Sequence, residues 1–473
     1  MTAPSGEVAG SRAADGVAGV LAARALELRA CPLDGPAAAA ARCAFVDWLG
    51  VTMGGSDCLP AAALRAGLGP ARGPSRIVGR PETVPASMAA LINGTAAHTL
   101  ELDDIYAPGL FHPGAPVIAA ALAAADQHDV TVAQLWRAIA TGYEIGCRAA
   151  ADLGPGHYSR WHTTGTAGAI GAAAAAAEIR QADARRFGHA LALAATMAGG
   201  LQQTFRRDAM GKPLHAGAAA QAGVVAAAAA LGGLTGAEDV LEGPAGLAAA
   251  TGSPTSWAYS RRELSRPLAI EAVTVKPYPC CGHAFAAIDA ALELREQGMR
   301  SADVSQVRVQ TYATALTVAG IACPATKAER RFSIPHLVAA ALVLGPAAMG
   351  RDGLAGESTA ADPEVRRIAG CVALGADPEF DRRFPQRRGA RVTVVTADGG
   401  QRAADVPDRS GSPENPLTTG QLEGKFLAAW PAHAGQGLLD RLRHDSTSVR
   451  SLGLSPQAPM PRPPSAMMTA PVM

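Results

Sequence analysis

Hydrophobic positions in the first half of the chain recur at helical spacing and show no strand-like alternation. This pattern predicts long helices within VAGVLAARALELRA (17–30), AAAAARCAFVDWLGVTMG (37–54), TVAQLWRAIATGYEIGCRAAADLG (131–154) and HAGAAAQAGVVAAAAALGG (215–233). A further segment, GAAAAAAEI (171–179), is small on every face, and small side chains let helix backbones approach one another closely. We therefore expect this half of the chain to be all-α.

The pattern changes around Pro267, where segments of strand type alternate with segments of helix type. Strands are predicted in AIEAVTVKPYP (269–279), in SQVRVQTYA (305–313) and in both halves of ARVTVVTADGGQRAADV (390–406). Helices are predicted in HAFAAIDAALELREQG (283–298), PHLVAAALVLG (335–345) and LTTGQLEGKFLAAW (417–430). Asp398-Gly399 is a strong hairpin signal between the last two strands, and a threonine opens the last helix as a candidate cap.

These patterns predict a mainly α fold, with a large all-α helical domain and a smaller α+β lid domain. Residues 1–266 are expected to form the first part of the helical domain, residues 267–411 the lid, and residues 412–445 a return to the helical domain. Residues 446–473 are rich in Pro, Ser and Met, so we expect them to be a disordered tail.

Composition excludes several classes of function. The formal net charge of the 473 residues is +1, whereas a nucleic-acid-binding protein is usually clearly basic. The eight cysteines form no CxxC pair, so neither a disulfide framework nor a zinc ribbon is predicted. Cys280, Cys281 and His283 cluster, but adjacent cysteines point apart on most backbones, which argues against a metal site there. The N-terminus lacks a signal peptide pattern, and the Ala- and Gly-rich run from Gly217 to Leu234 suits a core helix better than a membrane span. We expect a soluble, cytoplasmic protein with no nucleic-acid or membrane partner.

Ionisable residues gather in NGTAAHTLELDDIYAPGLFHPGAPV (93–117), within an apolar region of a chain that is only 18% charged. Burial of ionisable groups costs free energy unless they are paired with a partner, so such a cluster is either paired or part of a functional site. Glu101 and Asp104 would share one face if the segment were helical. The plainer alternative is that Asp103 or Asp104 accepts backbone hydrogen bonds at a helix end. His112 follows in a turn-like segment, where it either projects into a cleft or is simply solvated.

Other polar residues stand at the predicted ends of apolar elements. His162 precedes a helix start that includes Thr164 and suits an anion, although an ordinary cap fits equally well. Lys212 lies at the start of a very apolar predicted helix, and Lys276 lies at the end of a predicted strand. Each is either a cation that binds a carboxylate or an ordinary lysine that flanks the element. His336 opens another apolar helix, and its plainer role is a cap or core residue.

Taken together, these histidines, lysines and carboxylates suit proton transfer on a substrate that carries carboxylates. A neutral histidine can act as an acid or a base near pH 7, and lysines can stabilise an enediolate. The glycine spacing after His162 is GxxGxxG, with no strand before it and no P-loop lysine after it, so no nucleotide cofactor is predicted.

Several motifs carry a resemblance to a known family: NGTAAHTLELDD, HPGAPV, YSRWHTTGTAGAIGAAAAAA, GKPLHAGAAAQAG, VKPYPCCGHAFAAIDA, ERRFSIPHLVAAAL and LTTGQLEGKF. In this order, from about residue 40 to 430, the chain resembles the MmgE/PrpD family, which includes 2-methylcitrate dehydratase, cis-aconitate decarboxylase and iminodisuccinate epimerase. The resemblance implies a helical domain with an α+β lid, an active site between them that needs no metal or cofactor, and a homodimer.

The resemblance also implies roles for individual residues. It makes His112, His162, Lys212, Lys276 and Asp104 catalytic. It places Glu101, Asp103, Ile105, Thr164 and His336 at substrate-binding positions. Two of these depart from the decarboxylase-type pattern, since Ile105 stands where that pattern has Thr and His336 where it has Tyr. Both changes alter which substrate groups can be paired and argue against itaconate-forming decarboxylation.

We therefore expect a cofactor-independent lyase of the dehydratase type, which removes a proton α to a carboxylate of a small di- or tricarboxylate such as 2-methylcitrate. An epimerase of an iminodisuccinate-like dicarboxylate would use the same proton abstraction without elimination. Two further hypotheses are a cis-aconitate-type decarboxylase and a non-catalytic paralogue.

Overall fold

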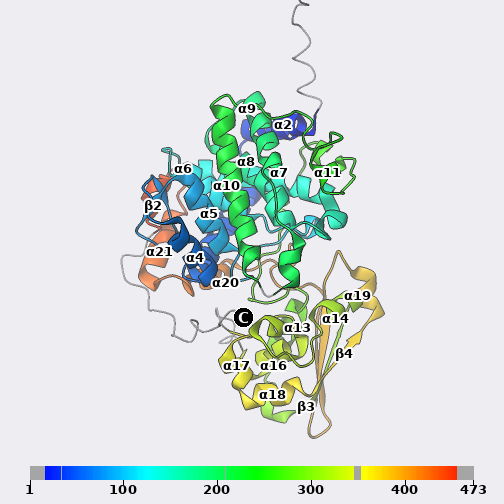
Figure 1. Ribbon diagram of the computed structural model, residues 1–473. Helices are drawn as coiled ribbons and strands as arrows, with labels where there is room; N and C mark the ends of the chain where they lie inside the picture. Colours follow the sequence, from blue (N-terminus) through cyan, green and yellow to red (C-terminus); the bar gives the residue numbers. More distant parts are fainter. Residues whose placement is uncertain (1–15, 34, 208, 346–352, 455–473) are drawn as a thin grey trace, which may run out of the picture.

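The computed structural model describes residues 16–33, 35–207, 209–345 and 353–454. Figure 1 shows a large helical lobe and a smaller lobe that carries a β-sheet. The core of the large lobe draws on residues from Val17 to Val275 and again from Leu422 to Leu454. A second core, from Tyr278 to Ala404, belongs to the smaller lobe. The mainly α class predicted from the sequence is confirmed.

The long helices of the large lobe are α2 (Val17–Ala30), α3 (Gly35–Gly55), α4 (Leu59–Leu68), α5 (Ala86–Ala97), α6 (Gly114–Ala125), α7 (Val132–Tyr158), α8 (Thr163–Ile179), α9 (Ala184–Thr196), α10 (Gly211–Leu231), α20 (Thr419–Leu427) and α21 (Ala432–Arg441). Its short elements are β1 (Ser75–Arg76), β2 (Thr83–Val84), η1 (Ala107–Gly109), η2 (Gln202–Arg206), α11 (Leu247–Ala250), α12 (Ala258–Arg261), η3 (Ala269–Ala272) and η6 (Val449–Leu452). All of the long helices predicted in this half are present. Within the described part of this lobe, the expectation of an all-α structure is corrected only by the ribbon of β1 and β2, two strands of two residues each.

Small residues allow the central helices to pack closely. Every residue of α8 is buried, and α8 packs against α6, α7, α9 and α10. Where α8 crosses α7, a Cβ atom on Gly171 would lie 2.8 Å from the carbonyl oxygen of Gly142. A side chain larger than hydrogen would therefore force these two helices apart.

Among the described residues, α10 is the one helix long and apolar enough to cross a membrane. However, 56% of its apolar window is buried, and it packs against α5, α6, α8 and α9. We therefore assign α10 to the core of the helical lobe, as its Ala-rich sequence predicts.

The smaller lobe contains a four-stranded sheet in the order β4-β3-β5-β6, in which only the β3–β4 pair is parallel. Its strands are β3 (Val304–Thr311), β4 (Val372–Ala376), β5 (Ala390–Thr396) and β6 (Gln401–Val406). Its helices are α13 (Phe285–Glu296), η4 (Ser301–Asp303), α14 (Ala313–Ala319), α15 (Lys327–Arg330), α16 (Ile334–Leu344), α17 (Glu357–Ala361), α18 (Pro363–Ala369) and α19 (Pro378–Arg383). The predicted hairpin at Asp398-Gly399 is confirmed as the connection from β5 to β6.

After β6 the chain returns to the large lobe. Helix α20 begins with a capping box at Thr418, as predicted, and packs on α3. In Figure 1, α20 and α21 (orange) accordingly lie on the helical lobe although they follow the smaller lobe in sequence.

Two predictions about local structure are wrong. The segment 269–279 forms η3 and then a single bridge between Thr274 and Ile105, because its apolar side chains Ile270 and Val273 pack into the helical core and not onto the sheet. The tail predicted to be disordered from Ser446 is ordered at its start, where Val449, Leu452 and Leu454 are buried. The rest of that predicted tail and the N-terminal residues 1–15 lie outside the described residues.

Candidate functional site

A tight turn between α5 and α6 brings the acidic cluster and His112 together. The backbone N–H of Tyr106 donates to the carbonyl oxygen of Phe111 at 2.7 Å, and Leu110 adopts a left-handed backbone conformation with φ 47°. The chain therefore doubles back after η1, and His112 returns to the side of Asp103 and Asp104. Since this segment is not helical, the idea that Glu101 and Asp104 share a helix face is wrong.

Asp104 acts as a buried acceptor at the start of α6. Its two carboxylate oxygens accept hydrogen bonds from the Gly114 backbone N–H at 2.9 Å and from the Tyr143 hydroxyl at 2.7 Å. Burial raises the pKa of Asp104 to about 7, against the lowering effect of both hydrogen bonds. The plainer alternative for this residue, an aspartate at a helix end, is therefore the one that the structure shows.

His112 is held by two hydrogen bonds that involve the backbone. Its Nδ1 lies 2.8 Å from the carbonyl oxygen of Asp104, and its backbone N–H donates to Thr164 Oγ1 at 3.2 Å. A carbonyl oxygen can only accept, so Nδ1 carries the proton and Nε2 presents a free lone pair. Burial lowers the pKa of His112 to about 3, although the charge of Asp103 opposes this. His112 is thus neutral and has the form of a base at Nε2.

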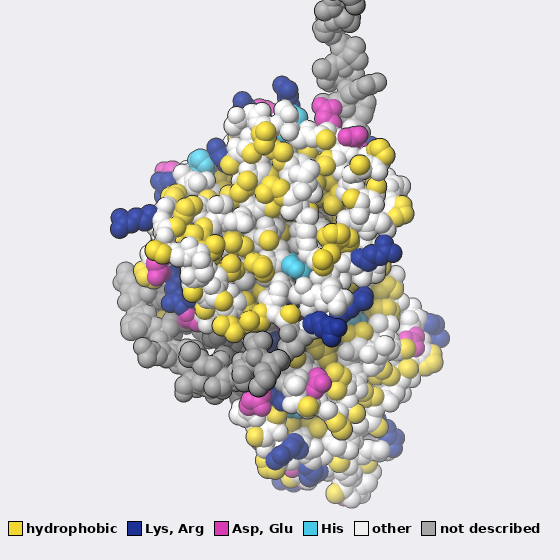
Figure 2. Space-filling model, viewed as in Figure 1, with side chains coloured by type: hydrophobic (Ala, Val, Ile, Leu, Met, Phe, Trp, Pro, Cys, Tyr) yellow, Lys and Arg dark blue, Asp and Glu magenta, His cyan; other side chains and the backbone are white. Residues whose placement is uncertain are grey.

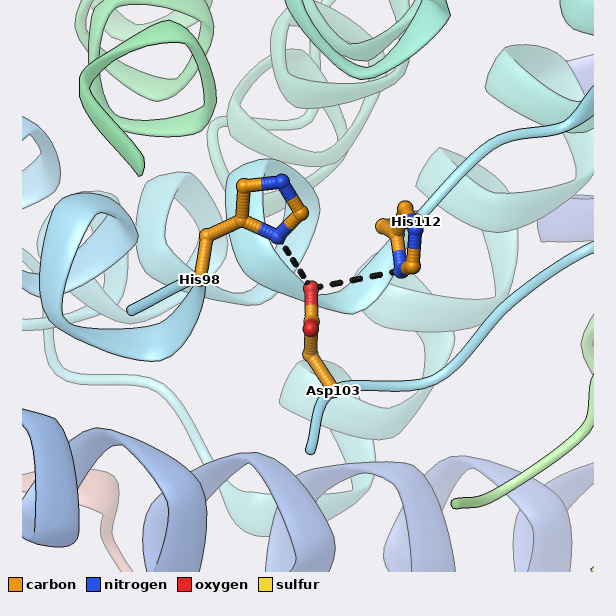
Figure 3. A group of neighbouring side chains, drawn as sticks. All are labelled: His98, Asp103 and His112. Carbon is orange, nitrogen blue, oxygen red and sulfur yellow. Dashed lines mark hydrogen bonds and ion pairs between the residues drawn. The ribbon is translucent and has the colours of Figure 1, made fainter. Parts of the chain in front are cut away.

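Figure 3 shows that Asp103 lies between two imidazoles, His98 from the end of α5 and His112 from the turn. One carboxylate oxygen of Asp103 lies 2.5 Å from His98 Nδ1 and 3.5 Å from His112 Nδ1. Burial would raise the pKa of Asp103, but His98 and His112 outweigh it and hold that pKa well below its ordinary range. Asp103 is therefore a buried anion that orients His98.

These three residues also offer ligand atoms that all lie within 4.8 Å of one another, close enough for a metal ion. The charge of Asp103 is already matched by its own neighbours, since Lys276 Nζ lies 4.0 Å from its second oxygen. We therefore interpret the group as a hydrogen-bonded pair with a neighbouring base.

A second pair of histidines continues the cluster. His162 precedes α8 as its N-cap residue and is fully buried, and its Nδ1 lies 3.2 Å from Nδ1 of His215 on α10. Its ring stacks on His98 with centroids 5.3 Å apart, and His98 in turn lies 4.9 Å from the His112 ring. Burial lowers the pKa of His162 well below its ordinary value, and the positive charge of nearby Lys212 acts in the same direction. The Nε2 atoms of His98 and His162 are buried without a hydrogen-bond partner among the described residues.

Two lysines converge on Glu101 beside these imidazoles. Lys212, the second residue of α10, forms an ion pair with the Glu101 carboxylate, and Lys276 Nζ lies 3.7 Å from the other oxygen of the same carboxylate. Lys276 also donates to the backbone carbonyl of Glu101 at 3.1 Å. Burial would raise the pKa of Glu101, but the two lysines hold it well below its ordinary range. Glu101 adopts a left-handed backbone with φ 58°, an unfavourable conformation for a glutamate that often marks a functional site.

Two predicted positions lie differently from the rest. His336 is in the smaller lobe at the start of α16, where its Nε2 contacts the carbonyl oxygen of Leu354 at 2.7 Å, and no described hydrogen bond or ion pair joins it to the cluster. Ile105 bonds through its backbone to Thr274, which ties the turn to the segment that carries Lys276. The remaining eight predicted site residues meet around the turn.

Sequence reasoning missed His98, His215 and Tyr143. His98 lies five residues before Asp103 in the same motif, and His215 lies three after Lys212, so each had a signal in its proximity to a residue that was predicted. Tyr143 lies within α7 and had no such signal.

Comparison with known proteins agrees with the mainly α fold. Residues 19–260 match the MmgE/PrpD N-terminal domain and residues 278–442 match the MmgE/PrpD C-terminal domain. The chain is 28% identical over 379 residues to the human (Homo sapiens) cis-aconitate decarboxylase, an alignment that covers 75% of each chain. It is 31% identical over 187 residues to the mouse (Mus musculus) cis-aconitate decarboxylase, an alignment that covers 37% of each. The chain belongs to the MmgE/PrpD family.

Proposed function

We propose that this protein is a cofactor-independent lyase that acts on a small di- or tricarboxylate, with dehydration of a 2-methylcitrate-type substrate as its reaction. Membership of the MmgE/PrpD family and similarity to a decarboxylase support a lyase-type enzyme. The reaction begins with removal of a proton α to a carboxylate.

The convergence of Lys212 and Lys276 on one carboxylate carries this proposal. In the structure that carboxylate belongs to Glu101, and the spacing of the two ammonium groups around it supports their use on a substrate carboxylate. A substrate with two or three carboxylates can place one of them against the same cations, at the edge of the buried imidazole cluster. The side chains of Glu101 and Lys212 are each about one quarter exposed, at 27% and 24%, so a substrate can reach them from solvent.

The imidazoles beside the lysines supply the base. His112 Nε2 presents a free lone pair, since its Nδ1 proton is used on Asp104, and His162 Nε2 is likewise unpartnered among the described residues. One of them accepts the α proton, and the electron pair of the broken C–H bond enters an enediolate that the lysine charges stabilise. The enediolate then expels the β-hydroxyl group, which leaves as water after protonation by an imidazolium, and a carbon–carbon double bond results.

Decarboxylation of a cis-aconitate-type substrate is the second candidate, because both named relatives are cis-aconitate decarboxylases. In that reaction the bond to a carboxylate breaks as carbon dioxide leaves, and an imidazolium returns a proton to the resulting carbanion. The side chains Ile105 and His336, which replace a Thr and a Tyr of the decarboxylase-type pattern, lead us to rank it second.

Incubation in deuterium oxide with 2-methylcitrate, citrate, cis-aconitate or iminodisuccinate, followed by proton NMR, tests the proposal. New olefinic signals with retention of every carboxylate support dehydration, whereas loss of carbon dioxide supports decarboxylation. Deuterium exchange without an olefin would assign an epimerase. Lack of any change in all four acids would contradict the proposed substrate class.

We also propose that the protein is a homodimer through the outer face of α10. Figure 2 shows apolar side chains gathered over α4, α5 and α10, with charged groups at the margins. Positions 214, 218, 221, 225 and 228 face outward on α10, and their spacing alternates between four and three residues, as in helices that pair along a heptad seam. Leu214 is 41% and Val225 is 39% exposed. The small side chains of Ala218 and Ala228 on the same face would let a second copy of α10 approach closely. An isologous pair of identical helices is the simplest occupant of such a face.

A further inference from the structure

We propose that His215 is a positioning residue for His162, through which the proton that His162 takes up passes to solvent. This inference rests on the proposed function, and of the two candidate imidazoles it takes His162 as the one that accepts the α proton. Nothing in the family comparison assigns a role to His215.

The geometry of the pair is fixed from both sides. The His162 backbone N–H donates to the carbonyl oxygen of Gly200 at 2.8 Å, and His162 Nδ1 lies 3.2 Å from His215 Nδ1. Gly200 has a φ of 122°, and a Cβ atom there would lie 3.0 Å from His215 Nδ1. A Cβ atom on Gly165 would lie 3.4 Å from the Cβ of His215. Gly200 therefore leaves room for the His215 ring at the point where it meets His162, whereas the Gly165 distance is an ordinary van der Waals contact.

A contact between two Nδ1 atoms holds one proton, which one imidazole donates and the other accepts. If His162 donates, its Nε2 has a free lone pair and can act as a base. The same Nε2 is buried and has no hydrogen-bond partner among the described residues. This is the state expected of a nitrogen whose partner is the substrate. His215 then accepts at Nδ1 and carries its own proton on Nε2.

The surroundings of His162 oppose a lasting positive charge on its ring. His98, His112 and Lys212 face His162 from neighbouring elements, and His98 and Lys212 also face His215. His162 is fully buried, whereas His215 is partly exposed. A proton is therefore better placed on His215, where water can solvate the charge and remove it.

The proposed transfer balances in three steps. The α C–H bond of the substrate breaks, its proton binds His162 Nε2, and its electron pair stays with the substrate as the enediolate. The proton on His162 Nδ1 then moves to His215 Nδ1, which leaves His162 neutral with a proton on Nε2. Finally His215 releases its Nε2 proton to solvent. When the β-hydroxyl group leaves, His215 takes up a proton from solvent at Nε2 and returns its Nδ1 proton to His162 Nδ1. The Nε2 proton of the resulting His162 imidazolium then passes to the hydroxyl group, which leaves as water, and both starting tautomers are restored.

Substitution of His215 separates proton transfer from simple positioning. Asn places an amide where the histidine has Nδ1, so His215→Asn can keep the contact to His162 but cannot carry the proton onward. We expect kcat to fall roughly 10- to 100-fold in both His215→Asn and His215→Ala, with KM nearly unchanged. Free imidazole should restore the turnover of His215→Ala, because the ring it replaces is reachable from solvent. His444→Ala removes an exposed histidine near α21 and serves as the control, with unchanged turnover and no response to imidazole.

Full activity of His215→Asn, or failure of imidazole to rescue a folded His215→Ala variant, would overturn the proposal. Nitrogen-15 NMR of the histidine rings tests it independently of any substrate. We expect His162 to carry its proton on Nδ1 in the unmodified protein and to lose that preference in His215→Ala. A His162 ring that is protonated only on Nε2 in the unmodified protein would overturn the inference even if the proposed reaction were confirmed. If the protein turned over no polycarboxylate, the position of the proton on His162 measured by NMR would alone decide whether His215 orients that ring.

Discussion

The ring Nδ1 of His112 lies 2.8 Å from the backbone carbonyl oxygen of Asp104. This contact uses the proton of Nδ1 and leaves Nε2 as the free nitrogen, so the backbone selects the tautomer that a general base requires. The neighbouring carboxylate of Asp104 is turned the other way, towards Gly114 and Tyr143. In this arrangement the backbone of Asp104 orients the base and its side chain anchors the turn.

Replacement of Asp104 by Asn should change how stability depends on pH. Burial raises the pKa of Asp104 from 3.8 to about 7, so the folded protein holds a proton that the unfolded chain releases. The stabilisation that this proton provides is complete below about pH 4 and is lost as pH rises to about 7, by roughly 4 kcal/mol in total. The measurement is the free energy of unfolding in urea at several pH values, for the unmodified protein and Asp104→Asn. As pH rises from about 4 to about 7, the free energy of unfolding of the unmodified protein should fall relative to that of Asp104→Asn. A difference between the two free energies that does not depend on pH would contradict the account.

Neutralisation of either lysine should weaken substrate binding. Lys212→Met or Lys276→Met removes one of the two charges that face the Glu101 carboxylate, and we expect KM for the substrate to rise roughly 10- to 100-fold. Steady-state kinetics on the acid that the protein turns over provides the measurement. Lys327→Met in the smaller lobe is the matched control, with unchanged KM. If KM were the same in all three variants, neither Lys212 nor Lys276 would bind the substrate.

Removal of metal ions should leave activity unaltered. Asp103 already has His98 and Lys276 as partners, so the group of His98, Asp103 and His112 needs no cation to balance its charge. Prolonged dialysis against a strong chelator, with turnover and metal content measured before and after, checks this. A loss of activity that added Zn²⁺ or Mn²⁺ restores would show that these residues are ligands.

Charge on the outer face of α10 should separate the proposed dimer. A glutamate at Leu214 or Val225 would have to be buried unpaired between two copies, so Leu214→Glu and Val225→Glu should convert a dimer to a folded monomer. Light scattering coupled to gel filtration measures the mass. Ile321→Glu, at a position 37% exposed in the smaller lobe, is the control and should remain dimeric. An unmodified protein that is monomeric at all concentrations would disprove the dimer.

The sequence predicted the helices well because their hydrophobic spacing is a local property. It failed at 269–279, where alternating apolar residues suit a strand but Ile270 and Val273 pack into the helical core. In the candidate site, too, residues with a local signal were predicted and residues that depend on tertiary contacts were not. His112 and Lys212 stood out from their immediate neighbours, whereas Tyr143 could be found only by its contact with Asp104, 39 residues earlier in the chain. Proton positions on His112 and His162 depend on tertiary partners, and no local pattern encodes them.

The most direct test of the central claim is the rate at which deuterium from solvent enters the α position of the substrate, measured by NMR for the unmodified protein, for His112→Asn and for His162→Asn. Asn has no basic nitrogen, so either substitution removes one of the two candidate bases. Exchange or elimination should fall roughly 100-fold or more in the variant that lacks the base, while the fold and substrate affinity remain. Equal rates in all three proteins, or no reaction of the unmodified protein with any of the four acids, would contradict the account.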